Sequence, residues 1–162
     1  MLEVLVSIVI LSFGALGLAG MQMTALKYNA VASTRSAATL LASELSDRMR
    51  SNLAGVKASN YTRNMDYNTA IGSPVTAPGC GSSTDCSGAQ LAQLDLAYWL
   101  ASIGAALPSG TGAVVPAAGN PLVSTIVVMW QEKSLLDAAA TDPGCPAPQV
   151  LGVRCFPTTF MP

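Results

Sequence analysis

The first 26 residues read MLEVLVSIVILSFGALGLAGMQMTAL, and the segment Val4–Leu26 within them carries no charge. Because a helix rises about 1.5 Å per residue, this segment spans roughly 34 Å, enough to cross the ~30 Å apolar core of a bilayer. Glu3 lies at the edge of the segment, where an ionised group is costly unless a partner lies beside it. The sequence therefore predicts a membrane anchor whose lone carboxylate is a candidate for recognising a partner.

Beyond Lys27 the pattern stays helical but becomes amphipathic. Apolar residues recur three, four or seven positions apart, which is typical of the buried face of a helix; they are Val31, Ala38, Leu41, Leu45, Met49 and Leu53. Two pairs, Glu44 with Arg48 and Asp47 with Arg50, are spaced for ion pairs on the exposed side. We predict one helix from residue 1 to about residue 53. Its first half, 1–26, is predicted to be the transmembrane half, and 27–162 to form a globular head.

Within the apolar segment, Gly14, Gly17 and Gly20 recur every third residue. Glycine weakens a helix in water by roughly 1 kcal/mol relative to alanine, whereas in lipid it permits neighbouring helices to approach closely. Two interpretations stay open. The glycines form a smooth face for helix packing or are simply tolerated in a membrane helix, or they mark a segment that stretches or unwinds locally when the helix moves from the bilayer into an assembly.

The composition excludes several functional classes. The 162 residues have a net charge of −1, only 10% of them are charged, and histidine is absent. No basic cluster is present, so binding that depends on neutralising several phosphates is not expected, and we predict no nucleic-acid partner. The commonest general base and metal ligand is missing too. We predict a structural protein rather than an enzyme.

Four cysteines follow the apolar segment: Cys80, Cys86, Cys145 and Cys155. None forms a CxxC pair of the kind that binds zinc, so two disulfides and an oxidising compartment are the better interpretation. We favour the sequence-local pairs, Cys80 with Cys86 and Cys145 with Cys155, each restricting the unfolded chain by ~2–3 kcal/mol. The sequence leaves the connectivity open.

The rest of the chain predicts a second helix and a small sheet. Ser87 begins a capping box before a helix at 89–107, whose buried side would comprise Leu96, Trp99, Leu100, Ile103 and Leu107. Trp99 reads as a core residue, with an interface anchor as the alternative. Strands are expected at 111–115, 124–132 and 150–160, the last an edge strand because it contains Pro157. We predict an α+β fold in which an antiparallel sheet buries one face and leaves the other wet.

The remaining carboxylates show no spacing typical of a catalytic pair and read as surface charge; they are Asp66, Asp85, Asp95, Glu132, Asp137 and Asp142. No serine lies in a nucleophile elbow. Asp137 and Asp142 near Gly144 are the best calcium candidates, but the loop lacks the alternating oxygen ligands of an EF-hand. We therefore predict no catalytic residue, no metal and no cofactor.

The segment MLEVLVSIVILSFG at 1–14 resembles the N-terminus of type IV pilins, and more narrowly of PilV-type minor pilins. The Trp130-Gln131-Glu132 strand end and the C-terminal segment RCFPTTFMP at 154–162 are similar to the PilV pattern. On this alignment Glu3 is the glutamate of the family and Met1 occupies the third mature position. The leader would lie upstream, missing here either through an internal start codon or through trimming of the chain.

The resemblance implies a pathway and a set of partners. A prepilin peptidase would cleave the precursor, the new amine would be methylated, and the protein would wait in the inner membrane, single-pass, with its head in the periplasm. An inner-membrane assembly platform would then move it into a filament at the cell surface. There Glu3 would meet the terminal amine of a neighbouring subunit. Other minor pilins, the major pilin and a PilY-type tip adhesin are the implied partners, and priming of assembly, adhesion and twitching motility the implied roles.

Two related functions stay open beside the minor pilin. A minor pseudopilin of a type II secretion system would have the same N-terminal features, an apolar helix with a glutamate at its edge. A DNA-uptake pilin would need exposed cations, and only four lie outside the long helix: Lys57, Arg63, Lys133 and Arg154.

Overall fold

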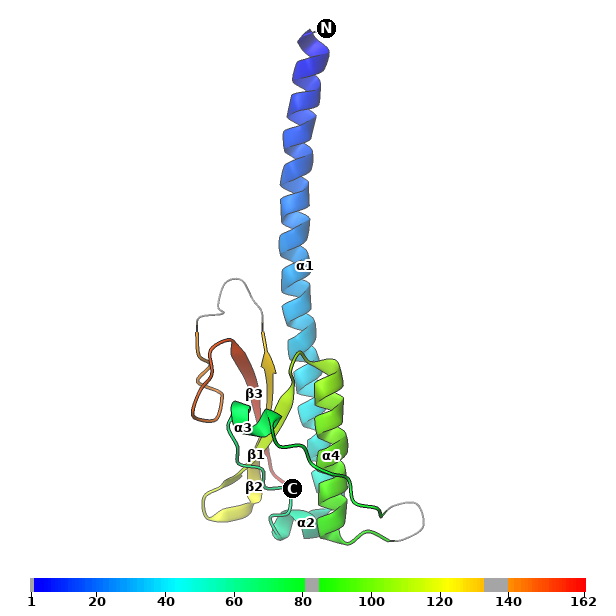
Figure 1. The fold of residues 1–162 in the computed structure, drawn as a ribbon, viewed down its shortest axis with the longest axis vertical. Coiled ribbons are helices and arrows are strands. Elements are labelled where there is room, and N and C mark those ends of the chain that lie inside the picture. The colour runs from blue at the N-terminus through cyan, green and yellow to red at the C-terminus, as the bar shows by residue number, and fades with distance from the viewer. Residues whose placement is uncertain (1, 81–84, 133–139) are drawn as a thin grey trace. The chain divides into compact units, whose positions relative to one another are not determined.

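The computed structural model describes residues 2–80, 85–132 and 140–162. Along the chain the elements are α1 (Leu2–Ser51), α2 (Leu53–Lys57), α3 (Tyr67–Ile71), α4 (Gly88–Ala106), β1 (Thr111–Ala117), β2 (Asn120–Gln131) and β3 (Val153–Phe160) (Figure 1). Contacts divide the chain into an N-terminal unit, Met1–Ser33, and a C-terminal unit, Thr34–Pro162. Helices and an antiparallel sheet occupy separate parts of the chain, which confirms the predicted α+β class.

The long helix α1 ends slightly earlier than predicted. Residues 2–51 contain no proline, and the helix stops at Ser51 because Asn52 caps α2, its Oδ1 accepting the Gly55 N–H at 3.1 Å. This break turns Leu53 outward, 41% exposed, so its predicted place in the buried stripe is wrong. The prediction is confirmed for four members of the stripe, which are buried: Ala38, Leu41, Leu45 and Met49. Val31 is half-buried and lies in the N-terminal unit.

Helix α4 begins at the predicted capping box. The Ser87 hydroxyl accepts the Gln90 N–H, and the Gln90 side chain accepts the Ser87 N–H at 3.0 Å. The predicted buried side is confirmed for Leu96, Trp99, Ile103 and Leu107, while Leu100 is half-buried. Trp99 is fully buried, and its Nε1–H donates to the Leu41 carbonyl of α1 at 2.8 Å. Its interpretation as a core residue is therefore confirmed.

Two glycines allow the chain to pass closely beneath α4. A Cβ at Gly110 would lie 2.7 Å from the carbonyl oxygen of Ile103, too close for any side chain. A Cβ at Gly112, in β1, would collide with the Trp99 ring. Glycine at both positions lets the first strand start directly under the helix that precedes it.

The three strands form one antiparallel sheet in the order β1-β2-β3. β1 pairs with β2 from Thr111 opposite Met129 to Pro116 opposite Ser124, and the register then shifts at Ala117, before a turn in which Gly119 has φ +79°. Each strand differs by a few residues from its predicted bounds. Pro157 lies in β3, which is an outer strand, as predicted from its missing N–H.

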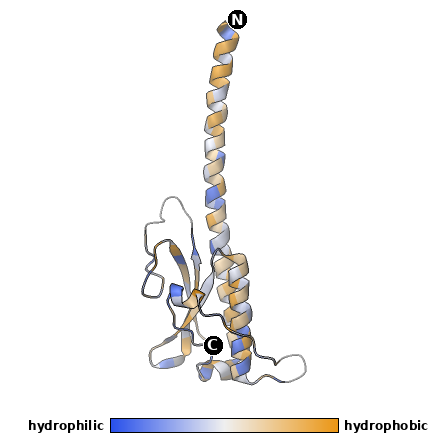
Figure 2. Ribbon diagram, in the orientation of Figure 1, coloured by the Kyte–Doolittle hydropathy of each residue, from blue (hydrophilic) through white to orange (hydrophobic). Residues whose placement is uncertain are grey.

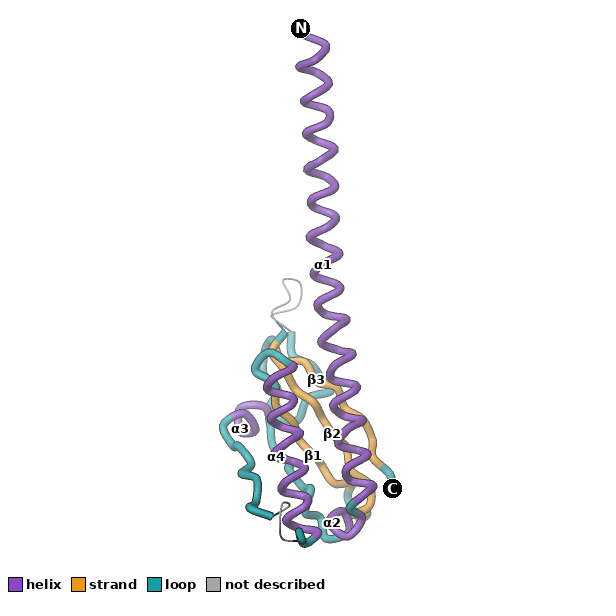
Figure 3. Tube along the Cα trace, turned by 90° about the vertical axis from the view of Figure 1, so that its right-hand side faces the viewer, coloured by secondary structure: helices purple, strands orange, loops and turns teal. Residues whose placement is uncertain are grey.

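The second face of the sheet, predicted to be wet, is covered over part of its length. Pro157 and Thr159 of β3, which share this face, are exposed, so the prediction is right only in part. Successive strand residues point to opposite faces. On one face Ile126, Val128 and Trp130 of β2 pack in a core with buried residues of α1 and α4, and Figure 3 shows these two helices over the sheet. On the other face Val127 and Met129 pack with Tyr67 and Ala70 of α3, with Val153 and with Cys145. The short helix α3 supplies the second cover.

Both sequence-local cysteine pairs are disulfide-bonded. Cys80 and Cys86 lie with Cα atoms 5.4 Å apart, and Cys145 and Cys155 with Cα atoms 5.2 Å apart. The first bridge closes the loop before α4, and the second joins the loop before β3 to the middle of that strand.

We predict that Leu45→Ala destabilises the C-terminal unit by ~2–5 kcal/mol, because it leaves a cavity beside residues that do not collapse to fill it. Leu40→Ala, in the same helix at a side chain 71% exposed, is the matched control and should change the unfolding free energy by less than about 0.5 kcal/mol. Urea denaturation followed by tryptophan fluorescence measures both. Equal losses in the two variants would contradict the packing described above.

Candidate functional site

The N-terminal unit exposes an unusual amount of apolar surface. α1 is long and apolar enough to cross a membrane, and none of its most apolar 18-residue window is buried within the chain. Figure 2 shows this part of the helix as largely hydrophobic. Its large apolar side chains are all more than half exposed: Leu2, Val4, Leu5, Val6, Ile8, Val9, Ile10, Leu11, Phe13, Leu16, Leu18, Met21, Met23 and Leu26. A continuous apolar surface of this size marks contact with lipid or with other protein.

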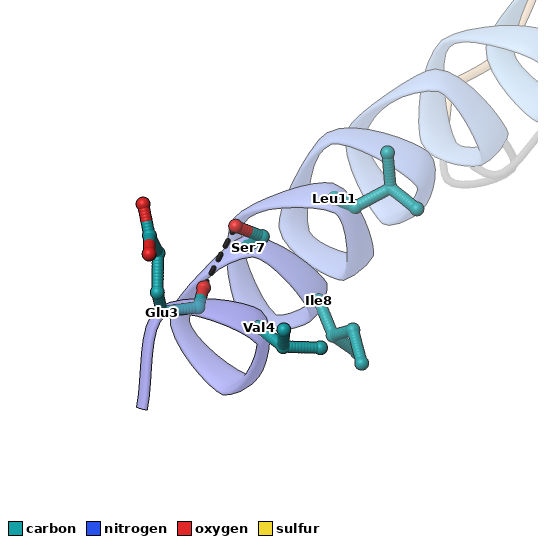
Figure 4. A pocket seen from close by; sticks show the side chains of 5 residues that line it. All are labelled: Glu3, Val4, Ser7, Ile8 and Leu11. Carbon is teal, nitrogen blue, oxygen red and sulfur yellow. Dashed lines mark hydrogen bonds between the residues drawn. The ribbon is translucent and has the colours of Figure 1, made fainter. Parts of the chain in front are cut away.

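Glu3 lies in the first turn of α1, where the helix dipole favours a negative charge. Figure 4 shows its carboxylate directed away from Val4 and Ile8, on the open side of the helix. None of the ion pairs among the described residues includes Glu3. The next ionisable residue along the chain is Lys27, beyond the apolar segment. Among the described residues, the nearest cationic side chain in the sequence is therefore that of Lys27.

The hydroxyl groups of the apolar segment are satisfied within the helix. Ser7 donates to the Glu3 carbonyl at 2.8 Å (Figure 4), Ser12 to the Ile8 carbonyl at 2.7 Å, and Thr24 to the Gly20 carbonyl at 3.1 Å. A polar group in hydrocarbon is costly unless it is hydrogen-bonded. These bonds make the segment compatible with an apolar environment in spite of its hydroxyls.

The three glycines of this segment are not required by packing within the chain. A Cβ built at Gly14, Gly17 or Gly20 meets nothing within 4 Å among the described residues. Gly110 and Gly112, by contrast, have no room for one. Packing among the described residues therefore gives no reason for the three glycines, and helix packing and local unwinding stay predictions.

The C-terminal unit contains a buried polar network centred on Asp95 of α4, whose residue is 5% exposed. One carboxylate oxygen accepts the Tyr61 hydroxyl at 2.5 Å, and the other accepts Arg48 Nη1 of α1 at 3.3 Å. Asn52 donates to the Tyr61 oxygen at 3.2 Å and to the Gly88 carbonyl at 2.8 Å. The network joins the end of α1, the loop after α2 and the start of α4.

The pKa values of two groups in this network, Tyr61 and Arg48, are shifted. Burial, together with the hydrogen bond to Asp95, raises the pKa of Tyr61 well above its usual range. The hydrogen bonds that Arg48 donates to Glu44 raise the pKa of Arg48 against the opposing effect of burial, and Asp95 adds to this rise. Both shifts favour the observed state, in which Tyr61 is a neutral donor and Arg48 a cation.

The predicted surface charge is wrong for two carboxylates, because Asp95 is buried and the Glu132 side chain is only 10% exposed, paired with Arg154 at 3.4 Å. Asp66 caps α3 through the amides of Asn68 and Thr69. Sequence spacing contained a signal for Asp95: it lies four residues before Trp99, on the side of α4 predicted to be buried. Nothing in the sequence indicated that Tyr61 and Asn52 would meet it there.

Asp142, one of the two calcium candidates, is engaged by backbone amides. Both oxygens of Asp142 accept backbone amides, Oδ1 from Gly144 at 2.9 Å and Oδ2 from Cys155 at 3.1 Å. Asp137 lies outside the described residues. Over the part of the chain that the structure describes, no group of three metal-ligating side chains occurs.

The cations considered for DNA binding are largely committed to structure. Arg63 is 6% exposed and donates to the carbonyls of Gly112, Ala70 and Ser73 at 2.6–3.1 Å. Burial lowers the pKa of Arg63 from its usual value. Arg154 is paired with Glu132, Lys57 is exposed, and Lys133 lies outside the described residues. This arrangement gives no basic surface among the described residues.

A long apolar-to-amphipathic helix followed by a disulfide-bonded antiparallel sheet defines the pilin-like class of architecture. Residues 20–97, just under half of the chain, match a family model described as Tt1218-like, Type IV pilin Tt1218. Over these residues the chain is similar to a type IV pilin. The matched range begins after the 1–14 segment, so it supports the resemblance on different residues. Comparison with curated proteins and comparison with solved structures each gave no match.

We predict that Tyr61→Phe destabilises the C-terminal unit by ~1–3 kcal/mol at neutral pH, because Asp95 and Asn52 each lose a buried partner. Tyr98→Phe, at a side chain 55% exposed, is the control and should be nearly neutral.

The stability of the wild-type protein should fall as pH rises above ~10. The pKa of Tyr61 is raised in the folded state, so the unfolded state loses the Tyr61 proton at a lower pH than the folded state does. Urea titrations across pH test this; a Tyr61→Phe variant with the same alkaline slope as wild type would contradict it.

Proposed function

We propose that the chain is a minor pilin of the PilV type, a structural subunit that helps to start type IV pilus assembly and to form the pilus tip. The observation that carries this proposal is the exposed apolar half of α1 with one acid, Glu3, at its end. A family match to a type IV pilin supports the broader class. The narrower assignment rests on the resemblance of the 1–14 and 154–162 segments to PilV-type sequences.

In the proposed pathway residues 1–26 anchor the protein in the inner membrane and 27–162 form the head in the periplasm. The exposed apolar side chains would lie in lipid at this stage, and the internally bonded hydroxyls of Ser7, Ser12 and Thr24 would add little to the cost of insertion. Disulfides at Cys80–Cys86 and Cys145–Cys155 fit an oxidising compartment. Assembly would then transfer the same apolar surface from lipid to the helices of other subunits.

Glu3 would set the register of that transfer. A carboxylate about 4 Å from the terminal amine of a neighbouring subunit gains ~4 kcal/mol at an effective dielectric constant of 20, and the same carboxylate is penalised when it stays unpaired in apolar surroundings. Subunits out of register would leave the charge without a partner. The contact would therefore select one position of the incoming helix among many that are equally apolar.

The partners of this function are other minor pilins, the major pilin, a PilY-type tip adhesin and the inner-membrane assembly platform, with the prepilin peptidase acting on the precursor. Gly14, Gly17 and Gly20 would serve at the helix contacts or as the place where α1 unwinds. The function requires no catalysis, and we assign no enzymatic role to the chain.

A deletion strain separates this proposal from the secretion pseudopilin. Loss of surface pili and twitching with intact protein secretion supports the minor pilin. Intact pili with lost secretion would contradict the minor-pilin proposal and support a pseudopilin of the secretion system. Complementation with the full-length gene, including its upstream leader, is the control.

We predict that Glu3→Gln lowers incorporation into filaments by about tenfold or more, because a charged hydrogen-bonded contact is lost, while membrane insertion and the fold of the head stay intact. Asp47→Asn is the matched control: its carboxylate lies in the same helix but outside the apolar segment, 76% exposed. Quantitative immunoblots of sheared pili and of membranes measure both. Normal incorporation of Glu3→Gln would refute the charge-pair role of Glu3.

A further inference from the structure

Lys27 is the cation that ends the apolar segment of α1. Within residues 1–33 the charged side chains are those of Glu3 and Lys27 alone, and the next carboxylate along the chain is that of Glu44. Lys27 is exposed, and none of the ion pairs among the described residues includes it. Its ammonium group can therefore take an anion from the surroundings of the chain.

Tyr28 follows Lys27 and is 63% exposed, whereas Tyr61 and Tyr67 of the C-terminal unit are buried. A tyrosine at the end of an apolar segment suits the boundary of a bilayer, where its ring lies among lipid chains and its hydroxyl among head groups. A lysine at the same level keeps its aliphatic stem on the apolar surface and extends its ammonium group toward the head groups. These two neighbouring residues thus have the chemistry of a membrane boundary.

The length of helix between Glu3 and Lys27 matches the thickness of a bilayer. The two residues are 24 positions apart, which corresponds to about 36 Å of helix. The apolar core of a bilayer is ~30 Å thick, and the bilayer with its head groups is ~40–45 Å thick. In an upright helix that crosses the bilayer, the two charges therefore lie in opposite head-group layers. Lipid phosphates repel the carboxylate of Glu3 in one layer and attract the ammonium group of Lys27 in the other.

The helix surface has a shallow hollow on the apolar side of Tyr28. Among the residues that line it with Tyr28 are Met21, Thr24 and Ala25. The Thr24 hydroxyl is hydrogen-bonded within the helix, donating to the Gly20 carbonyl at 3.1 Å, so it can lie against hydrocarbon at little cost. A phospholipid supplies both of the groups that this end of the segment suits, an acyl chain beside the hollow and a phosphate beside Lys27.

We propose that Lys27, beside Tyr28, binds the phosphate of an anionic phospholipid in the leaflet from which the chain continues toward the head. The ammonium group donates hydrogen bonds to the phosphate oxygens and neutralises the lipid charge. A choline lipid also has a phosphate, but its own cation competes with Lys27 for it, so an anionic lipid is preferred. One lysine near an anionic lipid surface gives a preference of about fivefold.

This inference rests on the membrane anchor of the proposed function and adds a lipid partner to it. Contact between Lys27 and a phosphate holds the helix at one depth in the bilayer while the protein is unassembled. The contact must break when the helix leaves the lipid for an assembly. Lys27 therefore acts on the retention of the free subunit in the membrane, whereas the proposed contact of Glu3 acts on its acceptance by a neighbouring subunit.

The test uses the full chain, with ¹⁵N-labelled lysines, in bilayers of phosphatidylcholine mixed with phosphatidylglycerol. Magic-angle-spinning NMR measures how far the lipid ³¹P nuclei weaken the signal of each lysine Nζ, which reports direct contact with phosphate. We expect a weakened signal for Lys27 and an unchanged signal for Lys57, an exposed lysine of α2 in the C-terminal unit. Spin-labelled lipids in the same bilayers measure the preference for phosphatidylglycerol over phosphatidylcholine, which should be about fivefold at the Lys27 site.

Lys27→Gln should abolish this preference, whereas Lys27→Arg and the matched control Lys57→Gln should retain it. A Lys27 signal that the phosphates leave unchanged, a preference that survives Lys27→Gln, or a preference that is lost in Lys57→Gln would each overturn the proposal. Extraction of the membranes with alkaline carbonate distinguishes the lipid site from the anchor. Release of the protein by carbonate would overturn both, whereas protein that stays in the membrane and shows no phosphate contact at Lys27 would overturn the lipid site alone.

Discussion

The carboxylate of Asp95 is the interaction on which the C-terminal unit most depends. An isolated buried charge is strongly unfavourable, so its position is fixed by the groups that satisfy it: Tyr61 on one oxygen and Arg48 on the other. These partners come from the end of α1 and from the loop after α2. Asn52 extends the network to Gly88, so the point where α1 ends is tied to the point where α4 begins. The Trp99 contact with Leu41 and the close passage of β1 under α4 follow from that alignment.

The N-terminal unit has the opposite character. Its apolar side chains, its three glycines and its single acid have no use within the chain: the side chains are exposed, the glycines adjoin empty space, and Glu3 is absent from the ion pairs among the described residues. Such a helix is stable only when something else covers it. In the proposed function, a membrane and then the helices of other subunits would supply this cover. The C-terminal unit thus buries its apolar core with its own residues, whereas the apolar side chains of the N-terminal unit stay exposed.

Charge is used sparingly, and mostly for structure. Arg63 binds three carbonyls, Asp142 caps two amides, and Asp66 caps α3, so these charged residues hold loops in place. Pro116 and Pro157 lie in the two outer strands of the sheet, β1 and β3.

Local sequence determined the elements of this protein. The uninterrupted apolar run and its exposed Glu3, the Ser87 capping box, the buried side of α4 and the edge position of Pro157 each follow from spacing and residue chemistry over a few turns or one strand. Tertiary structure alone decided what joins these elements. Asn52 ends α1 early and turns Leu53 outward, and α3 covers part of a sheet face predicted to be wet. Asp95 is buried because Tyr61 and Arg48 converge on it from distant positions. Helical and strand periodicity record which way a side chain faces, but not which distant group will meet it there, because that depends on how the whole chain packs.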